Sequence, residues 1–295
     1  MDSPLVAQLL QIAVPITMFT LMFAMGLTLN TDDFKRVVRF PKAVIVGLFI
    51  NLFILPLVGL GLAAGFDLPI MIAVGLVAVA ACPGGTTSNV IVHMGKGDTA
   101  LSITLTAMAT AVTLFTLPLW VNFTLAKYGN NGALVEMPVI KTAAQLALFT
   151  LLPVILGMLA RAKRPNWVKS EPVLSKISFV AMLAAFIGAG IADSGNTLKD
   201  ASVIIIPAIL LLVAAVIIGF LLPKIFGINT RDSATIAVES TLKNILLSFF
   251  IATNALQINE VAYASAIVGI IMMPTAMGIM LVYRMLHKSQ TELRS

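Results

Sequence analysis

Two short stretches of the sequence concentrate polar residues inside otherwise apolar surroundings. Residues 82–89 read Cys-Pro-Gly-Gly-Thr-Thr-Ser-Asn, and residues 239–244 read Glu-Ser-Thr-Leu-Lys-Asn. Side-chain oxygens and freed backbone carbonyls of this kind can cage a Na⁺ ion. The unpaired N–H groups at the start of a helix instead favour an anion. These stretches therefore predict a binding site for small ions.

Glu239 and Lys243 stand out because both fall inside a long apolar run. A charge at the centre of a bilayer costs roughly 2.5–3.5 kcal/mol on insertion scales, so intramembrane charges usually mark functional sites. The two residues are four apart and could pair along one face if the segment is helical there. A purely structural ion pair that pins two parts of the fold is the alternative interpretation.

The composition explains why these residues are conspicuous. Of 295 residues, 59% are hydrophobic and 11% are charged, against about 45–50% and about 25% in soluble domains. A soluble fold and intrinsic disorder are excluded on these figures, and the continuous apolar runs exclude the alternating pattern of a transmembrane β-barrel. The predicted class is an all-α polytopic membrane protein. The net charge is +6, but in a membrane protein the distribution of Lys and Arg reports orientation, so no nucleic-acid partner is expected.

About nine apolar runs are long enough to cross a bilayer core of about 30 Å. They cover, roughly, residues 4–28, 42–66, 69–94, 99–125, 139–160, 174–193, 202–223, 232–254 and 261–284. Of the 19 Lys and Arg residues, 15 fall on one side of this arrangement and three on the other, with Lys243 inside a run. The positive-inside rule then places the N-terminus outside and the C-terminus in the cytoplasm.

The two polar stretches lie in the third and eighth runs, which cross the membrane in opposite directions. Pro83, Gly84 and Gly85, with polar residues behind them, cannot continue a regular helix at membrane depth. A broken helix at the matching place in each half is typical of an inverted-topology repeat. Runs 1–4 would then pair with runs 6–9, which leaves the fifth run without a partner.

Residues 25–29 (Met-Gly-Leu-Thr-Leu), 82–89 and 239–244 resemble the bile acid:sodium symporter family in order and spacing. The resemblance covers nearly the whole chain. It implies an inverted repeat with two broken crossing helices, in a nine-helix form that lacks the first helix. It assigns 1–40 and 135–200 to a panel domain, 41–134 and 201–288 to a core domain, and 289–295 to a cytoplasmic tail. It implies an integral protein of a bacterial inner membrane.

The resemblance also implies two sodium sites, of which one is altered here. The first site would use side-chain oxygens of Ser88, Asn89, Ser102, Thr106 and Glu239. At the second site, Lys243 and Asn51 stand where the family has Gln, and the other ligands would be carbonyls near Glu239, Ser240 and Leu242. We hypothesise that the Lys243 ammonium replaces the second sodium ion, because it brings the same charge and three N–H donors.

The implied substrate is an organic anion, either a bile acid or a smaller carboxylate such as pantoate or a 2-oxo acid. Thr86, Thr87 and Asn244 are the expected substrate-binding residues. Bacterial relatives can carry a His on the last helix near the substrate, whereas the last run here contains Met272-Met273-Pro274-Thr275. The substrate of this chain is therefore expected to differ.

Several alternatives remain open at this stage. Transport could be coupled to H⁺ if Lys243 loses its proton during the cycle, or it could be independent of Na⁺. An arsenite-type efflux permease would instead depend on Cys82. An intramembrane hydrolase would need a general base beside Ser88, which the nearby sequence lacks, so no enzyme is expected. The expected partners are the organic anion, Na⁺ as coupling ion and the lipid bilayer, with no resident cofactor or other metal.

Overall fold

The computed structural model describes residues 4–31, 41–128, 138–192, 194–256 and 258–292, and all regular structure in these ranges is helical. In chain order the elements are α1 (Pro4–Thr28), α3 (Pro41–Phe49), η1 (Ile50–Ile54), α4 (Leu55–Gly65), α5 (Ile70–Ala81), α6 (Thr86–Met94), α7 (Thr99–Tyr128), α8 (Val139–Leu146), η2 (Ala147–Leu151), α9 (Leu152–Lys163), η3 (Pro165–Ser170), α10 (Glu171–Ala192), α11 (Ser194–Ile225), α12 (Thr230–Thr241), α13 (Ile245–Phe250), η4 (Ile251–Leu256) and α14 (Asn259–Glu292). The predicted all-α class is confirmed.

Six helical segments of the described chain are long and apolar enough to cross a bilayer. They are 11–28, 41–65, 99–128, 139–163, 202–225 and 261–281. Two shorter apolar helices, 70–81 and 245–256, are each separated by a break from a more polar helix, α6 and α12 respectively. Helix α10 supplies the remaining predicted run. Large apolar side chains such as Ile12 and Phe115 are more than 60% exposed, as expected for a surface that faces lipid.

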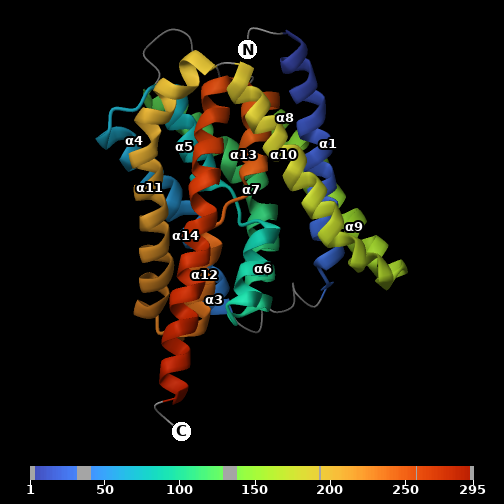
Figure 1. Cartoon of the computed structure of the whole chain (residues 1–295), viewed down its shortest axis with the longest axis vertical. Helices are drawn as coiled ribbons and strands as arrows, with labels where there is room; N and C mark the ends of the chain where they lie inside the picture. The colour runs from blue at the N-terminus through green and yellow to red at the C-terminus, as the bar shows by residue number, and fades with distance from the viewer. Residues whose placement is uncertain (1–3, 32–40, 129–137, 193, 257, 293–295) are drawn as a thin grey trace.

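The helices form two groups that Figure 1 shows side by side. In one group α1 packs against α9 and α10, and in the other α5, α7, α11, α12 and α14 pack against their neighbours. In the first group the helices approach very closely, since a Cβ on Gly157 would lie 2.3 Å from the carbonyl oxygen of Phe23. Small residues at helix contacts are the usual means of such packing in membranes.

The division into panel and core segments stays a prediction, and α11 runs across its boundary at residue 200. The movement of panel and core as separate domains stays a prediction as well. Residues 289–292 of the predicted tail continue α14 as helix, and residues 293–295 lie outside the described part of the chain. Residues 32–40, which include three of the predicted cytoplasmic basic residues, lie outside it as well.

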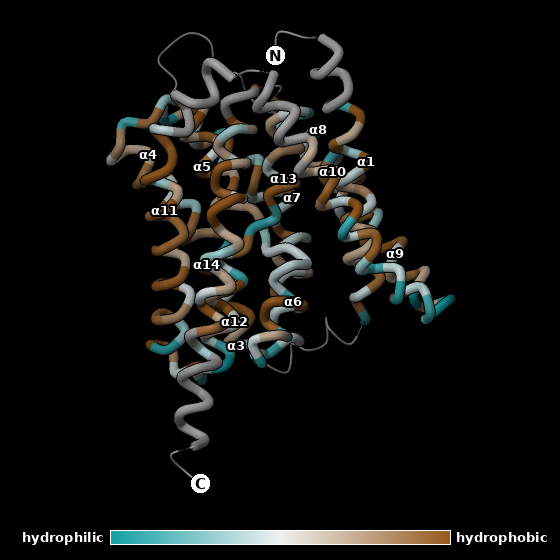
Figure 2. Tube along the Cα trace, viewed as in Figure 1, coloured by the Kyte–Doolittle hydropathy of each residue, from teal (hydrophilic) through white to brown (hydrophobic). Residues whose placement is uncertain are grey.

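The two broken elements meet at their breaks, as the sequence predicts. Gly84 and Lys243 form an isolated antiparallel β-bridge, and the Asn244 N–H donates to the Pro83 carbonyl at 2.8 Å. Each break thereby satisfies backbone groups of the other, which the interior of a membrane requires. Figure 2 shows hydrophilic residues near the middle of the molecule and at the helix ends, with apolar residues along the outer helices.

Loops predicted on one side of the membrane do lie at one end of the molecule. The Arg231 guanidinium at the start of α12 donates to the Gly97 carbonyl at 3.0 Å, and the Asp98 N–H donates to Thr235 Oγ1 at 2.9 Å. The loop between α6 and α7 and the loop between α11 and α12 are therefore neighbours. This agrees with the alternation of the predicted spans, while the assignment of this end to the cytoplasm stays a prediction.

Candidate functional site

A buried cluster of oxygens surrounds the Glu239 carboxylate at the end of α12. The Ser88 hydroxyl of α6 and the Ser102 hydroxyl of α7 both donate to Glu239 Oε1, and Thr106 Oγ1 donates to Oε2 at 2.8 Å. All four side chains are at most 1% exposed. Helix α12 thus brings its carboxylate to the oxygens of the consecutive helices α6 and α7, which are distant from it in sequence.

The protons in this cluster are fewer than the acceptors. Ser102 Oγ also lies 2.7 Å from Asn89 Oδ1, and Ser88 Oγ also lies 2.6 Å from the Gly85 carbonyl oxygen. A hydroxyl has a single proton, so each serine meets two acceptors and can satisfy only one. An excess of buried acceptor oxygens is the environment that a hard cation prefers. The five residues predicted for the first sodium site are therefore together, although the structure does not test their role.

Gly84 is a residue of this cluster whose importance the sequence did not reveal. A Cβ at Gly84 would lie 2.2 Å from Glu239 Oε2 and 3.3 Å from Thr106 Oγ1. We expected this glycine only as part of the helix break. The close approach of the first break to the carboxylate depends on the two elements crossing here, which no local pattern encodes.

Lys243 does not pair with Glu239, and the pairing considered from their spacing is wrong. Helix α12 ends at Thr241 and Leu242 is extended, so the spacing of four residues is not helical here. The Lys243 Nζ instead donates to Asn51 Oδ1 at 2.7 Å. The purely structural Glu239–Lys243 ion pair is therefore excluded as well.

Asn51 holds the Lys243 ammonium from the π-helical turn η1. Its Nδ2 group donates to the Gly47 carbonyl at 2.9 Å and to Ser240 Oγ at 3.5 Å. Asn51 and Lys243 are 3% and 5% exposed. Two residues predicted for the altered second site are thus in direct contact with each other, and Ser240 lies beside them. The other two residues predicted for the second site have different surroundings. The Leu242 side chain packs in an apolar cluster, and the Glu239 carboxylate lies in the first site.

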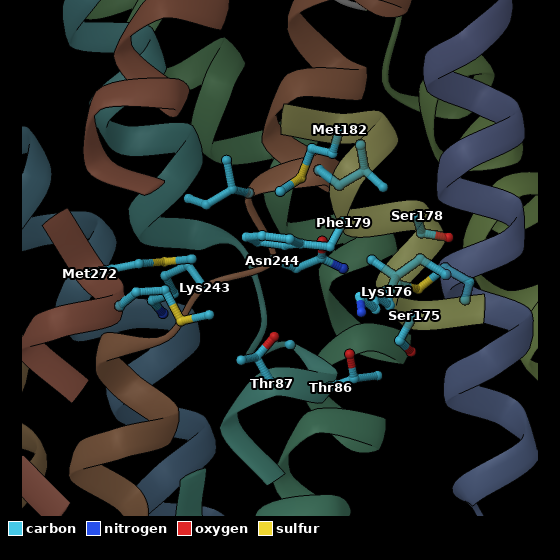
Figure 3. Close-up of a pocket in the computed structure, with 16 residues that line it drawn as sticks. Thr86, Thr87, Ser175, Lys176, Ser178, Phe179, Met182, Lys243, Asn244 and Met272 are labelled. Carbon is cyan, nitrogen blue, oxygen red and sulfur yellow. The ribbon is translucent and has the colours of Figure 1, made fainter. Parts of the chain in front are cut away.

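A cavity of about 220 Å³ opens beside the crossing, between the two helix groups. The predicted substrate residues Thr86, Thr87 and Asn244 all line it, as Figure 3 shows. Thr86 and Thr87 begin α6, where the N-cap residue Gly85 provides no side-chain hydrogen bond. Asn244 uses its Oδ1 to accept from the Leu247 N–H at the start of α13.

The remaining walls of the cavity are mostly apolar. Side chains from α1, α10, α13 and α14 supply them, namely Leu21, Met22, Phe179, Met182, Ile245, Leu246, Met272 and Met273. Among the described residues that line the cavity, Lys176 and Lys243 carry charge and none is acidic. We expected Lys176 only as one of the 15 basic residues on the predicted cytoplasmic side, but it lies in the second turn of α10 and its side chain reaches the cavity. Sequence reasoning missed this residue.

Cys82 lies next to the first break but away from the cavity. It is 0% exposed and packs in an apolar cluster with Met18, Met22 and Phe249. An arsenite carrier would need this thiol to be reachable. Its burial therefore gives the arsenite alternative no support.

Comparison with known proteins places this geometry in context. The sodium bile acid symporter family model matches residues 15–200. A Bacillus subtilis protein named as an uncharacterized sodium-dependent transporter, YocS, is 34% identical over 239 residues, which cover 79% of this chain and 71% of the relative.

Eukaryotic relatives are longer than this chain. The rice probable sodium/metabolite cotransporter BASS2 of the chloroplast is 32% identical over 84% of this chain and 58% of its own length. The human ileal sodium/bile acid cotransporter is 29% identical over 76% of this chain and 64% of its own length. The chain thus spans less than two thirds of these two proteins.

Proposed function

Because this chain belongs to the sodium bile acid symporter family, we propose that it moves a small organic anion across the membrane together with Na⁺ by alternating access. The observation that carries the proposal is the oxygen cluster around Glu239, in which acceptors exceed protons. A sodium ion there would satisfy the acceptors that the two serine hydroxyls leave unpaired. The proposed ligands are Ser88, Asn89, Ser102, Thr106 and Glu239.

We further propose that a single Na⁺ accompanies each anion. Lys243 places an ammonium at the second site and is already held by Asn51 at 2.7 Å. A sodium ion next to this ammonium would be repelled, because two like charges at such a distance destabilise each other. The Lys243 ammonium then supplies, as a permanent part of the protein, the positive charge that a second transported Na⁺ would otherwise supply.

Uptake into proteoliposomes at varied Na⁺ concentration tests both proposals. The wild type should take up the anion only with an inward sodium gradient, and uptake should depend on Na⁺ with a Hill coefficient near one. Lys243→Gln should raise the coefficient, because it restores a neutral oxygen ligand at the second site. A wild type that already shows cooperative dependence on two sodium ions would sink the single-ion proposal. Uptake that is indifferent to Na⁺ would refute sodium coupling.

Coupling to H⁺ is the second candidate. The observation that favours it is that Lys243 donates its hydrogen bond to the uncharged Asn51. A neutral amide stabilises the protonated lysine less than a carboxylate would, so release of the proton during the cycle is easier. A pH gradient applied in sodium-free buffer distinguishes the two. It should drive uptake only if a proton replaces the sodium ion.

The cavity favours a small carboxylate such as pantoate or a 2-oxo acid over a bile acid. Its volume of about 220 Å³ is below the range of roughly 300–1,000 Å³ that is usual for sites of drug-sized ligands. The two helix groups on either side would move against each other during transport. We place the protein in the inner membrane of a bacterium, with its N-terminus outside and its C-terminus in the cytoplasm.

A further inference from the structure

Three hydrogen-bond donors from opposite sides of the cavity face one another. Figure 3 shows the Lys176 side chain reaching from α10 toward the crossing, with the amide nitrogen of Asn244 and the hydroxyl of Thr86 on the core side. Lys176 belongs to the helix group of α1, α9 and α10, whereas Thr86 and Asn244 belong to the two broken elements. The donors therefore come from both helix groups.

These donors have no acceptor of their own. Within the described ranges, no side chain or carbonyl accepts a hydrogen bond from Lys176 Nζ, Asn244 Nδ2 or Thr86 Oγ1, although Asn244 is only 5% exposed. The hydroxyl of Ser178, which is 1% exposed and also lines the cavity, has no hydrogen-bond partner in this part of the chain either. Buried polar groups are rarely left unpaired without reason. Of the three donors only the Asn244 amide is buried, and its missing acceptor points to a ligand that brings one.

The other lysine of the cavity is not available for this ligand. The Lys243 ammonium points away from the cavity and donates to Asn51. Lys176, by contrast, is exposed and retains the hydration of its ammonium until an anion arrives. The N-terminus of α6, which carries no side-chain cap, adds a favourable dipole at the same place.

We propose that Lys176 of α10 binds the carboxylate of the transported anion, from the wall that faces the substrate residues already expected from the family resemblance, Thr86 and Asn244. The apolar walls then receive the rest of the molecule, so the substrate is a compact monocarboxylate with an apolar chain. A second acidic group would meet methionine and phenylalanine side chains and lose its hydration. This assignment rests on the proposed transport function and names the substrate class of the same site.

Binding to the purified full-length protein, measured by calorimetry, tests the assignment without requiring transport. The probes are pantoate, 2-oxoisovalerate and pantolactone, the uncharged cyclic form of pantoate. The wild type should bind at least one of the two acids and should not bind pantolactone. Lys176→Met should weaken binding of that acid by roughly 10- to 100-fold, which is the usual effect of losing a hydrogen bond to a charged group. Lys176→Arg should retain most of the affinity.

Lys169→Met is the matched control. Lys169 is an exposed lysine on η3, seven residues from Lys176, and does not line the cavity. Its variant should bind the acid as the wild type does, which separates a local contact from the loss of one surface charge. If Lys176→Met does not fold, Lys176→Gln provides the same test, because it removes the charge but keeps a polar group at this exposed position, and it should also weaken binding.

Three outcomes would overturn the assignment: unchanged affinity of a folded Lys176→Met protein, equal binding of pantoate and pantolactone, or no binding of either acid to the wild type. The sodium titration of uptake is independent of these measurements. Sodium-driven uptake that is unaffected by Lys176→Met would refute the role of Lys176 and leave the proposed function standing. Carboxylate binding that depends on Lys176, with no sodium-driven uptake, would support the role of Lys176 and refute the proposed sodium-coupled transport.

Discussion

Gly84 is the residue at which the helix break and the oxygen cluster constrain each other. The position of its Cα leaves no space for a side chain, because a Cβ would lie 2.2 Å from Glu239 Oε2. The glycine therefore serves two purposes: it allows the chain to unwind, and it lets the backbone approach the carboxylate.

Gly84→Ala should raise the Na⁺ concentration needed for half-maximal uptake by roughly 10- to 100-fold. This is the usual effect of disturbing a group that orients a metal ligand, and here the added methyl group would displace the Glu239 carboxylate. The measurement is sodium-dependent uptake into proteoliposomes at saturating substrate. Gly61→Ala is the control, because a Cβ there would meet nothing within 4 Å. An unchanged sodium requirement in Gly84→Ala would show that Glu239 does not bind the coupling ion.

Individual residues also show how far the sequence could be read. The contact between Lys243 and Asn51 joins two positions at which the sequence departs from the family pattern, and it is present at 2.7 Å. The family resemblance had assigned both residues to one altered site, so their proximity was expected, while their role in ion coupling stays a prediction. Lys176 had no such signal, because a lysine near a predicted span end is typical of a cytoplasmic loop.

At the scale of elements, the apolar runs and the two breaks were predictable from the sequence. The π-helical turns and the packing position of α10 were not. Breaks at 82–85 and 242–244 follow from proline, glycine and polar residues at membrane depth. The π-helical turns η1 and η2 carry no comparable signal, although each precedes a proline, at Pro56 and Pro153. The position of Lys176 depends on where α10 lies across the cavity from α6, which is a tertiary property.

The contact between α1 and α9 depends on glycine in both helices. A Cβ on Gly26 would lie 2.2 Å from the Val154 carbonyl oxygen, and one on Gly157 would lie 2.3 Å from that of Phe23. Both obstacles are backbone atoms of the neighbouring helix, so they cannot yield as a flexible side chain can.

Gly157→Ala should destabilise the protein by about 1–3 kcal/mol, which is the usual cost of adding atoms to a well-packed contact. A lower midpoint of thermal unfolding in detergent would report this effect. Gly278→Ala on α14, where a Cβ would meet nothing within 4 Å, should unfold at the wild-type temperature. Equal thermal unfolding midpoints for the two variants would mean that the close contact between α1 and α9 does not contribute to the stability of the protein.

At the scale of the whole molecule, the cysteine content of the chain suits it to a labelling test of the predicted orientation in the membrane. Cys82 is the only cysteine in the sequence, and it is 0% exposed. A cysteine introduced at an exposed position can therefore be labelled against an unreactive background.

A membrane-impermeant maleimide added to intact spheroplasts should modify Lys127→Cys and should not modify Lys96→Cys. The positive-inside rule places Lys127 outside and Lys96 in the cytoplasm, and both side chains are exposed. Permeabilised spheroplasts, in which both variants should react, provide the control for reactivity. Labelling of Lys96→Cys alone in intact spheroplasts would invert the predicted orientation.

The mutual hydrogen bonding of the two breaks has a consequence for how the protein is made. The Pro83 carbonyl obtains its donor from Asn244, about 160 residues later in the chain. During synthesis the first broken helix must enter the bilayer long before its partner exists. Until then its free peptide groups need water or the insertion machinery as a temporary partner. Assembly of the crossing is therefore a late step of biogenesis, which can begin only when the second half of the chain has been inserted.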